Sequence, residues 1–363
     1  MRSVLVLALV GLGACDADPP AQDAGARDGG SSDGGASDGG ASDGGASDGG
    51  AGDGGSSDAG ADAGVEELCP PGSGALTLEL SGVTLERVPG LPLDDGFVSG
   101  FAIVEGPVWA RGALYFSHFG GGPTPASRIL RLDPSGVVSV AAGDAGVNGL
   151  ALGPDGRLYG GRHMDGSVSV FDWDDLAAAP SPVVARYEGA RFNSPNDLVL
   201  HSNGTLYFSD PGWQAPSPAP QAAERAYRVP PGGAPEPIAG TPSRPNGIAL
   251  SLDERALFVT GTNGMRRYVL DASGAIVEGP LDVAAVSGGL DGLGRDCAGN
   301  LYVTGGERVR VLGPDLTLLG ELAAPGATNV AFGGDDRRTL YVTALGAGAG
   351  LLRARLNVPG LPD

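Results

Sequence analysis

Six polar side chains recur along the chain at a regular interval, and each begins the same kind of phrase. The phrase continues with an apolar stretch, a glycine turn and a segment such as Leu-Tyr-Phe, as in PNDLVLHSNGTLYFSD from Pro195. Successive lead residues are 43, 48, 50, 45 and 38 positions apart. They comprise one glutamate, one aspartate and four asparagines: Glu105, Asn148, Asn196, Asn246, Asp291 and Asn329. If the fold brings them together, they form a set of oxygen ligands.

Carboxylate and carboxamide oxygens are hard donors. They suit Ca²⁺, or Mg²⁺ and Mn²⁺ with more water, and they suit Zn²⁺ less well without His or Cys. A cation held in this way can polarise a carbonyl and help ionise water, and a nearby carboxylate can act as base or nucleophile. The alternative is that Asn and Asp stand here because they favour turns. That alternative competes well for Asn148 and Asn329, and less well for Glu105, Asn246 and Asp291, which apolar sequence flanks.

The elements that position these residues are short strands between Gly, Pro and Asp turns. Each lead residue starts a hairpin, and further strand-like sequence follows it, for example RILRLDP after the first copy and LLRARL after the last. A period near 45 residues fits the four-stranded blades of a propeller, whereas the rungs of a β-solenoid are much shorter. We therefore predict an all-β, six-bladed β-propeller. Residues 75–88 are expected to complete the last blade, and the only helix-like fragment is 172–179.

The N-terminal region differs from this repeat. Residues 1–14 contain one basic residue, Arg2, and a short apolar stretch before Cys15, which is typical of a bacterial lipoprotein signal. The apolar run is too short to span a bilayer. We predict a signal peptide over 1–14, a lipidated Cys15 with a disordered linker over 15–67, and the propeller over 68–363. An ordinary cleaved signal with an incidental Cys is the alternative.

The linker accounts for most of the charge of the chain. It repeats Ala-Ser-Asp-Gly-Gly and holds 11 Asp, two Glu and one Arg in all, whereas the whole chain of 363 residues has a net charge of −20. Such a segment lacks the apolar content needed to offset the entropy of ordering, and its charges repel one another. A calcium-binding repeat would need apolar positions that are missing here, so a solvated spacer is expected. An acidic chain without a basic cluster argues against nucleic-acid binding.

Two cysteines remain if Cys15 carries lipid. Cys69 begins the globular part and Cys297 follows the fifth lead residue. In an exported protein they are candidates for a disulfide that would attach the N-terminal segment to a blade. Two free buried thiols are the alternative.

Five motifs resemble those of the gluconolactonase, senescence-marker-protein and luciferin-regenerating family of six-bladed propellers. They are EGPVW, SPNDL, RPNGIALS, LDGLGRD and TNVAFGG, in the order of the family and over residues 95–348. The resemblance implies metal ligation by Glu105, Asn246 and Asp291, with Asn196 beside the metal as ligand or substrate contact. It implies Ca²⁺ as the usual ion, and Asp291 as catalytic base or nucleophile.

The resemblance also suggests substrate-binding side chains. It places Asn148 and His163 near the pocket, Arg191 where relatives offer an arginine, and Trp213 where a loop carries an aromatic. His118 follows the inner strand of the first blade and could reach the channel, and His201 is expected to be structural. Trp213 could stack on a sugar ring or could simply cap a blade.

Two functions of different classes follow from these expectations. The first is a metal-dependent hydrolase of small-molecule lactones or related esters, with phosphotriesters as a further substrate option. The second is a non-catalytic surface propeller that binds a sugar or peptide and holds a structural ion. No G-x-S-x-G or P-loop motif points elsewhere. We expect a monomer that is exported and attached by lipid alone to a bacterial envelope membrane, on its periplasmic or outer face.

Overall fold

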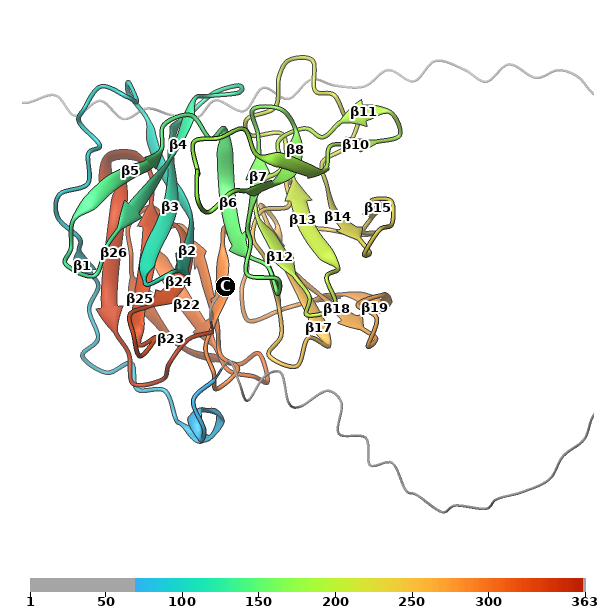
Figure 1. Ribbon diagram of the computed structural model, residues 1–363. Helices are drawn as coiled ribbons and strands as arrows, with labels where there is room; N and C mark the ends of the chain where they lie inside the picture. The colour runs from blue at the N-terminus through green and yellow to red at the C-terminus, as the bar shows by residue number, and fades with distance from the viewer. Residues whose placement is uncertain (1–68, 362–363) are drawn as a thin grey trace, which may run out of the picture. The chain divides into compact units, whose positions relative to one another are not determined.

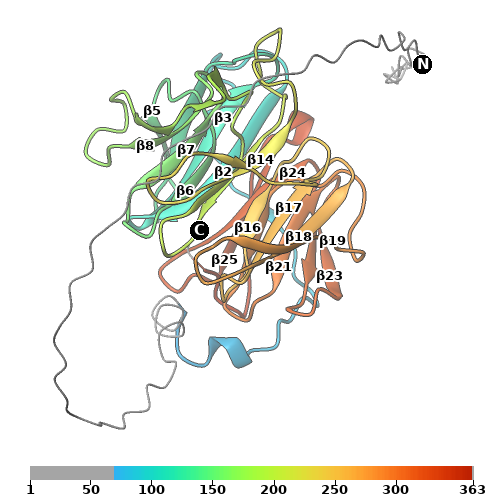
Figure 2. The same cartoon turned by 90° about the vertical axis from the view of Figure 1, so that its right-hand side faces the viewer.

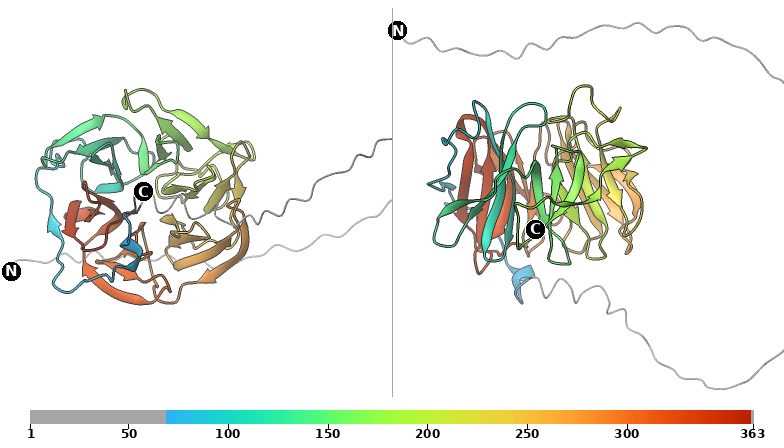
Figure 3. Two further views of the ribbon diagram at one scale, coloured as in Figure 1. Left: turned by 60° about the horizontal axis from the view of Figure 1, so that its bottom comes forward. Right: turned by 45° about the horizontal axis from the view of Figure 1, so that its top comes forward.

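The computed structural model describes residues 69–361, which form six four-stranded antiparallel sheets and one additional two-stranded hairpin. The sheets stand side by side around a central axis (Figure 1) and radiate from it when the domain is viewed from below (Figure 3, left). The prediction of a six-bladed β-propeller is therefore confirmed. We number the blades 1 to 6 from the N-terminal side of the repeat.

The first three blades occupy the first half of the repeat. Blade 1 contains β2 (Ala102–Ala110), β3 (Ala113–Gly120), β4 (Ser127–Leu132) and β5 (Val138–Ala142). Blade 2 contains β6 (Val147–Leu152), β7 (Leu158–Arg162), β8 (Ser167–Phe171) and β9 (Ser181–Val184). Blade 3 contains β12 (Leu198–Leu200), β13 (Leu206–Asp210), β14 (Arg225–Val229) and β15 (Glu236–Pro237). The additional hairpin, β10 (Arg186–Tyr187) and β11 (Ala190–Arg191), lies between blades 2 and 3 in the chain.

The last three blades follow the same order. Blade 4 contains β16 (Ile248–Leu250), β17 (Ala256–Gly261), β18 (Gly264–Leu270) and β19 (Ile276–Asp282). Blade 5 contains β20 (Leu293–Arg295), β21 (Leu301–Gly305), β22 (Arg308–Leu312) and β23 (Leu318–Ala323). Blade 6 contains β24 (Ala327–Gly333), β25 (Thr339–Ala344), β26 (Gly350–Arg355) and β1 (Glu86–Arg87). The 3₁₀ turns η1 (Ser73–Ala75) and η2 (Gly346–Gly348) complete the elements.

Blade 6 closes the propeller with strands from both ends of the domain. Its outer strand β1 pairs antiparallel with β26, with Glu86 opposite Arg353 and Arg87 opposite Leu352. The Arg87 guanidinium also donates to the carbonyls of Gly348 and Ala349. This confirms that part of residues 75–88 completes the last blade. Pairing the first strand with the last three leaves no open interface between the first and last blades.

The hydrophobic core is divided among the six interfaces between neighbouring blades. Between blades 1 and 2, for example, Val108, Tyr115 and Ile129 pack against Leu150 and Phe171. The same arrangement recurs between the other pairs of neighbouring blades. Each fully buried aliphatic or aromatic side chain contributes about 1.5 to 3 kcal/mol. The channel can therefore stay polar because the stabilising contacts lie between the sheets.

The helix-like fragment at 172–179 is a pair of turns instead. The Asp172 carboxylate accepts the Asp174 N–H, and the Asp175 carboxylate accepts the Ala177 N–H. These local bonds compete with helical hydrogen bonding, because short acidic side chains capture nearby backbone donors. Within residues 69–361 there is no helix long and apolar enough to cross a bilayer. The predicted signal peptide, Cys15 and the linker lie outside the described residues and remain predictions.

Cys69 and Cys297 form a disulfide, so the expected pair is present. It joins the start of the described chain to the turn after β20, with 5.6 Å between the two Cα atoms. Leu361 and Leu252 pack against it. The segment that follows, with η1, runs along the lower edge of the domain before it reaches β1 (Figure 2). The disulfide therefore lies at the lower end of blade 5.

Candidate active site

The lead residues lie at one end of the channel. The inner strands of the blades are β2, β6, β12, β16, β20 and β24, and a lead residue stands within or just before each of them. Because neighbouring inner strands run the same way along the axis, the side chains at this position surround the same opening. Glu105, Asn148, Asn196 and Asn329 are buried, and Asn246 and Asp291 are partly accessible. We call these six residues the ring.

Three of the predicted metal ligands meet in the structure. The Asp291 carboxylate accepts hydrogen bonds from the protonated Glu105 carboxyl and from the Asn246 side chain. Glu105 is also hydrogen-bonded to Asn329, and its carboxylate accepts the N–H of Gly106 at 2.8 Å. Side chains from blades 1, 4, 5 and 6 therefore contact one another although up to 224 residues separate them. This contact is what the metal hypothesis required of Glu105, Asn246 and Asp291.

A glycine after the lead residue makes this convergence possible in four blades. A Cβ placed on any of these glycines would lie less than 3.0 Å from the lead residue of the next blade. Gly247, for example, faces the backbone of Asp291 and Gly292, and Gly149 faces the carbonyl of Asn196. Glycine allows such close backbone approach because it has no side chain. The four residues are Gly106, Gly149, Gly247 and Gly292.

Gly247→Ala is expected to lower the free energy of unfolding by about 2 kcal/mol, because backbone atoms cannot move aside for the new methyl group. It should also lower the hydrolytic activity proposed below by at least about tenfold, since displacement of Asp291 disturbs the reacting geometry. Thermal melting and initial rates check both effects. Gly143→Ala is the matched control, because Gly143 has open space around its Cβ position. Equal stability of the two variants would contradict the packing role of Gly247.

Hydroxyl groups on the second strands hold the ring in register. Ser209 donates to the backbone carbonyl of Asn246, and Thr260 donates to that of Asp291. Thr304 donates to the carbonyl of Thr328, and the Thr328 hydroxyl donates in turn to Val104. Each bond joins one blade to the backbone at or beside the next lead residue. Sequence reasoning missed these residues, although a Ser or Thr recurs after the Leu-Tyr-Phe or Leu-Tyr-Val segment.

Asp197 is a further carboxylate that sequence reasoning missed. It occupies the position that is glycine in the neighbouring blades, so its side chain enters the channel. The carboxylate accepts the N–H groups of Leu198 and Ile248 at 3.0 and 3.3 Å, and the Asn329 amide at 3.4 Å. Burial raises the pKa of Asp197 to about 7. The difference between PND in this blade and PNG in the next was the signal that could have identified it.

Burial and like charge dominate the electrostatics of the ring. Burial is the main cause that raises the pKa of Glu105 well above its usual range, and the Asp291 charge adds to it. Burial likewise raises the pKa of Asp291, and the nearby charge of Asp197 adds to it. Within residues 69–361, the charged groups that act most strongly on these carboxylates are other carboxylates. A bound cation would relieve this repulsion.

The donor set fits a hard divalent cation. The side-chain oxygen Oδ1 of Asn148 is buried without a hydrogen-bond partner in the described part of the chain. The same holds for the Ser117 hydroxyl, which lies opposite Glu105. Buried oxygens without partners are rare in folded proteins and call for an explanation such as an ion or water. In the described residues, no three His, Cys, Asp or Glu side chains form a metal-binding cluster. The ring instead combines carboxylates with carboxamides, which is the chemistry that Ca²⁺ favours.

The two histidines predicted to face the pocket are fully buried. Arg128 donates to Nδ1 of His118, and Nε2 of His163 donates to the carbonyl of Pro125. Burial is the main cause that lowers the pKa of both imidazoles to about 4, so both are neutral near pH 7. Neither side chain has exposed surface through which to contact a substrate. One ring nitrogen of each, Nε2 of His118 and Nδ1 of His163, has no hydrogen-bond partner in residues 69–361, and their substrate binding stays a prediction. His201 is also buried.

Arg191 and Trp213 have different surroundings. The Arg191 guanidinium donates to the carbonyls of His163, Met164 and Phe192, so it fastens two loops together instead of facing a substrate. Trp213 is 39% exposed, and Arg244 lies over its ring at 4.6 Å from the centroid. Trp213 thus remains accessible to a ligand, whereas Arg191 does not fit the predicted role.

Asp210 positions the segment that leads into Asn196. Its carboxylate accepts the N–H groups of Asn193 and Ser194 at 2.9 and 2.7 Å. Asp210 is fully buried, and burial raises its pKa to about 7. Sequence analysis did not identify Asp210, which ends β13 and anchors the segment before a ring residue.

The fold and the ring place this chain in one class of proteins, the six-bladed propellers that carry carboxylates and carboxamides at one end of the channel. The chain belongs to the SMP-30/Gluconolactonase/LRE-like family, whose model matches residues 103–346. It is 30% identical over 277 residues to a gluconolactonase of Zymomonas mobilis, with 66% of this chain and 75% of that protein covered. It is 29% identical over 256 residues to a 6-deoxy-6-sulfogluconolactonase of Pseudomonas putida, covering 66% and 82%.

A solved structure agrees with these sequence relatives. The gluconolactonase XC5397 from Xanthomonas campestris superposes with a TM-score of 0.62 at 28% identity. The match covers 77% of this chain and 98% of that protein. The similarity therefore extends over nearly all of the propeller.

Proposed function

We propose that this protein hydrolyses lactones or closely related esters at the ring. The observation that carries the proposal is the contact of Asp291 with Glu105 and Asn246 at the channel end. The lactonase relatives that share this fold support the choice of substrate class. The reaction adds water across the ester bond of the lactone and yields a hydroxy acid.

The residues that would hold a divalent cation are Glu105, Asn196, Asn246 and Asp291. When bound, Ca²⁺ or a similar ion supplies a Lewis acid that polarises the lactone carbonyl and stabilises developing negative charge. The two carboxylates would balance the charge of a divalent ion. Glu105 and Asn246 already contact Asp291, so these three ligands need little rearrangement.

Asp291 is the proposed general base. Its partial exposure allows it to contact a water at the channel opening, whereas Glu105 is buried. The water attacks the carbonyl carbon, and Asp291 accepts the proton that the water loses. The C–O bond of the lactone then breaks, and the proton passes to the departing alkoxide oxygen. Burial raises the pKa of Asp291 to about 8, and a bound cation beside it would lower this pKa and keep the carboxylate ionised near neutral pH, as a general base requires.

Residues at the rim are proposed to orient the substrate. Trp213 offers an exposed aromatic surface on the loop after β13, and such surfaces favour the apolar face of a sugar-like ring. This loop also contacts a loop of blade 1, since the Thr124 N–H donates to the Gln214 carbonyl at 2.9 Å. Asn148 is proposed to contact the ion or a substrate hydroxyl through its unpartnered oxygen.

Removal of divalent cations with EDTA is expected to lower lactone hydrolysis by at least about 100-fold while the blades stay folded. The reason is that transition-state charge stabilisation at such sites is worth several kcal/mol, whereas the hydrophobic contacts between the blades do not involve the ring. Rates are measured with a pH indicator on a panel of lactones, aryl esters and phosphotriesters. Circular dichroism follows folding, and elemental analysis identifies the ion. Added Ca²⁺ should restore activity.

The non-catalytic alternative makes the opposite prediction. A purely structural ion would give a large fall in melting temperature after EDTA and no turnover on any member of the panel. That combination would overturn the proposed function and favour a propeller that binds a sugar or peptide.

A further inference from the structure

Asn329 is a buried ring residue whose side-chain amide is hydrogen-bonded at both ends. Its oxygen Oδ1 accepts the N–H of Val330 at 2.8 Å. Its nitrogen Nδ2 donates to the Asp197 carboxylate at 3.4 Å, and the side chain also donates to Glu105. The amide therefore presents its NH₂ group to the two acidic residues beside it, one from blade 1 and one from blade 3.

The chemistry of these neighbours fixes the orientation of the amide. A carboxamide has one oxygen that accepts and one nitrogen that donates two hydrogens. The Val330 N–H needs an acceptor, whereas Glu105 and Asp197 need donors, so only one of the two orientations satisfies all three. Gly292 packs directly against the amide, since a Cβ there would overlap the oxygen of Asn329. The oxygen therefore faces the backbone of Val330 and Gly292 rather than the cation site.

Asp197 extends this connection to a third blade. Its carboxylate accepts the backbone N–H of Ile248 at 3.3 Å. Ile248 follows Asn246 by two residues at the start of β16 in blade 4. Asn329 and Asp197 thus link Glu105 to the strand that follows Asn246, and both of those residues are among the proposed cation ligands.

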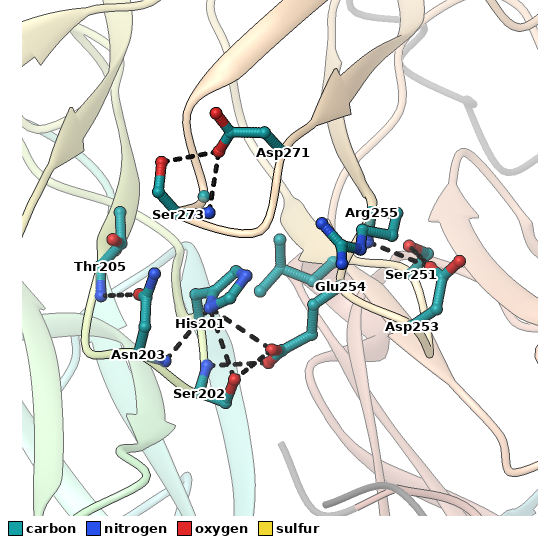
Figure 4. A network of polar contacts seen from close by, with 12 residues as sticks. His201, Ser202, Asn203, Thr205, Ser251, Asp253, Glu254, Arg255, Asp271 and Ser273 are labelled. Carbon is teal, nitrogen blue, oxygen red and sulfur yellow. Dashed lines mark hydrogen bonds and ion pairs between the residues drawn. The ribbon is translucent and has the colours of Figure 1, made fainter. Parts of the chain in front are cut away.

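A cavity of about 170 Å³ lies directly below this pair of side chains. Asp197 and Asn329 border its upper end, and Ser202 and Glu254 border its lower end, with mainly aliphatic side chains between them. At the lower end Glu254 accepts two donors of Ser202 and lies 3.4 Å from Nδ1 of His201 (Figure 4). In the described part of the chain the space beneath Asp197 and Asn329 is open, so hydrogen bonds rather than packing from below hold them in place.

We infer, on the basis of the proposed function, that Asn329 positions the cation site without ligating the ion. Its NH₂ group holds Glu105 in the place where that side chain would bind the ion, and its contact with Asp197 gives the same support to the strand after Asn246. Hydrogen-bonding partners of metal ligands orient them, and loss of such a partner typically weakens metal affinity by about 10- to 100-fold.

Calcium titration of the full-length protein tests the inference. Asn329→Ala leaves the charge of the site unchanged, and it is expected to weaken Ca²⁺ binding by about 10- to 100-fold in isothermal titration calorimetry. Lactone hydrolysis should fall at limiting Ca²⁺ and return in excess Ca²⁺, because the proposed ligands and base are still present. This return distinguishes a positioning residue from Asp291, whose loss excess Ca²⁺ should not repair.

Two comparisons separate positioning from general effects on stability and charge. Asn300 is also a buried asparagine, and its amide donates to the Asp296 carboxylate at 2.8 Å at the lower end of blade 5. Asn300→Ala should therefore lower the melting temperature and leave Ca²⁺ affinity unchanged. Asp197→Asn and Glu254→Gln remove the same charge at opposite ends of the cavity, and the first should weaken Ca²⁺ binding far more than the second. This pair also decides the outcome if Asn329→Ala does not fold.

The possible results separate the inference from the proposed function. Unchanged Ca²⁺ affinity in Asn329→Ala, or an equal loss in Asn300→Ala, would overturn the inference while lactone turnover by the natural protein upheld the proposed function. The expected losses of affinity without turnover of any lactone would support the positioning role and overturn the proposed reaction. Absence of Ca²⁺ binding by the natural protein would overturn both.

Discussion

Asp291→Asn is expected to lower kcat/KM for lactone hydrolysis by at least about 1000-fold while the protein stays folded. The carboxamide has the same shape and keeps one oxygen ligand. It cannot accept the proton from water, and general-base catalysis alone contributes about 100- to 10,000-fold. It also removes one of the two negative charges available to a cation. Initial rates on the lactone panel, with the ion in excess, measure the effect.

Stability separates this catalytic role from a structural one. In the ion-free protein, Asp291→Asn removes a carboxylate from beside Glu105, so the melting temperature should not fall. Glu105→Gln should show the same loss of activity, because it removes the second charge. Asp335→Asn, an exposed carboxylate on blade 6, is the matched control and should retain full activity. Full activity of both ring variants would exclude the proposed site.

The double substitution Cys69→Ser with Cys297→Ser is expected to lower the free energy of unfolding by about 4 kcal/mol. The disulfide closes a loop of 228 residues, and in the chain-entropy model a longer loop restricts the unfolded chain more. For a domain of this size the melting temperature should fall by about 8 °C. Differential scanning calorimetry checks the value.

Reductant provides the control for the disulfide prediction. Added reductant should lower the melting temperature of the natural protein to that of the double variant, and it should leave the variant unchanged. Lactone hydrolysis at 25 °C should survive in both, because the ring lies at the other end of β20. A melting temperature that responds to neither treatment would contradict a stabilising role for the bridge.

The ring shows how a repeated backbone produces a single asymmetric site. Each blade offers an equivalent position, but only blades 1 and 5 place a carboxylate there, and blade 3 adds Asp197 one residue later. Glycines allow the inner strands to approach, and hydroxyl groups such as those of Thr260 and Thr304 fix the backbone that carries the ligands. In the proposed reaction, this preorganisation would lower the cost of orienting the ligands.

Much of the fold could be predicted from the repeat alone. The period of about 45 residues predicts the blades, and the polar lead residue predicts which end of the channel carries the site. Local pattern suffices for both, since strand alternation and turn residues act over a few positions. The proximity of Glu105 to Asp291 also follows, because equivalent positions of a closed propeller surround the same opening. The family motifs pointed to the same residues.

Individual side-chain roles depended on contacts distant in sequence. Arg191 and His163 were expected near the substrate, yet the arginine binds the carbonyl of that very histidine and both serve to join loops. The sequence pointed to Asn196 and not to Asp197, because only the packing of blades 3 and 4 shows that the aspartate enters the channel.

The sequence by itself therefore determined the propeller, the position of the ring and the candidate disulfide. Tertiary structure alone decided which predicted site residues are buried, such as His118 and His163, and which remain accessible, such as Trp213. The physical reason is that burial and pKa depend on the atoms that surround a side chain. In a propeller those atoms come from neighbouring blades, about 40 to 50 residues away in the chain or at its opposite end.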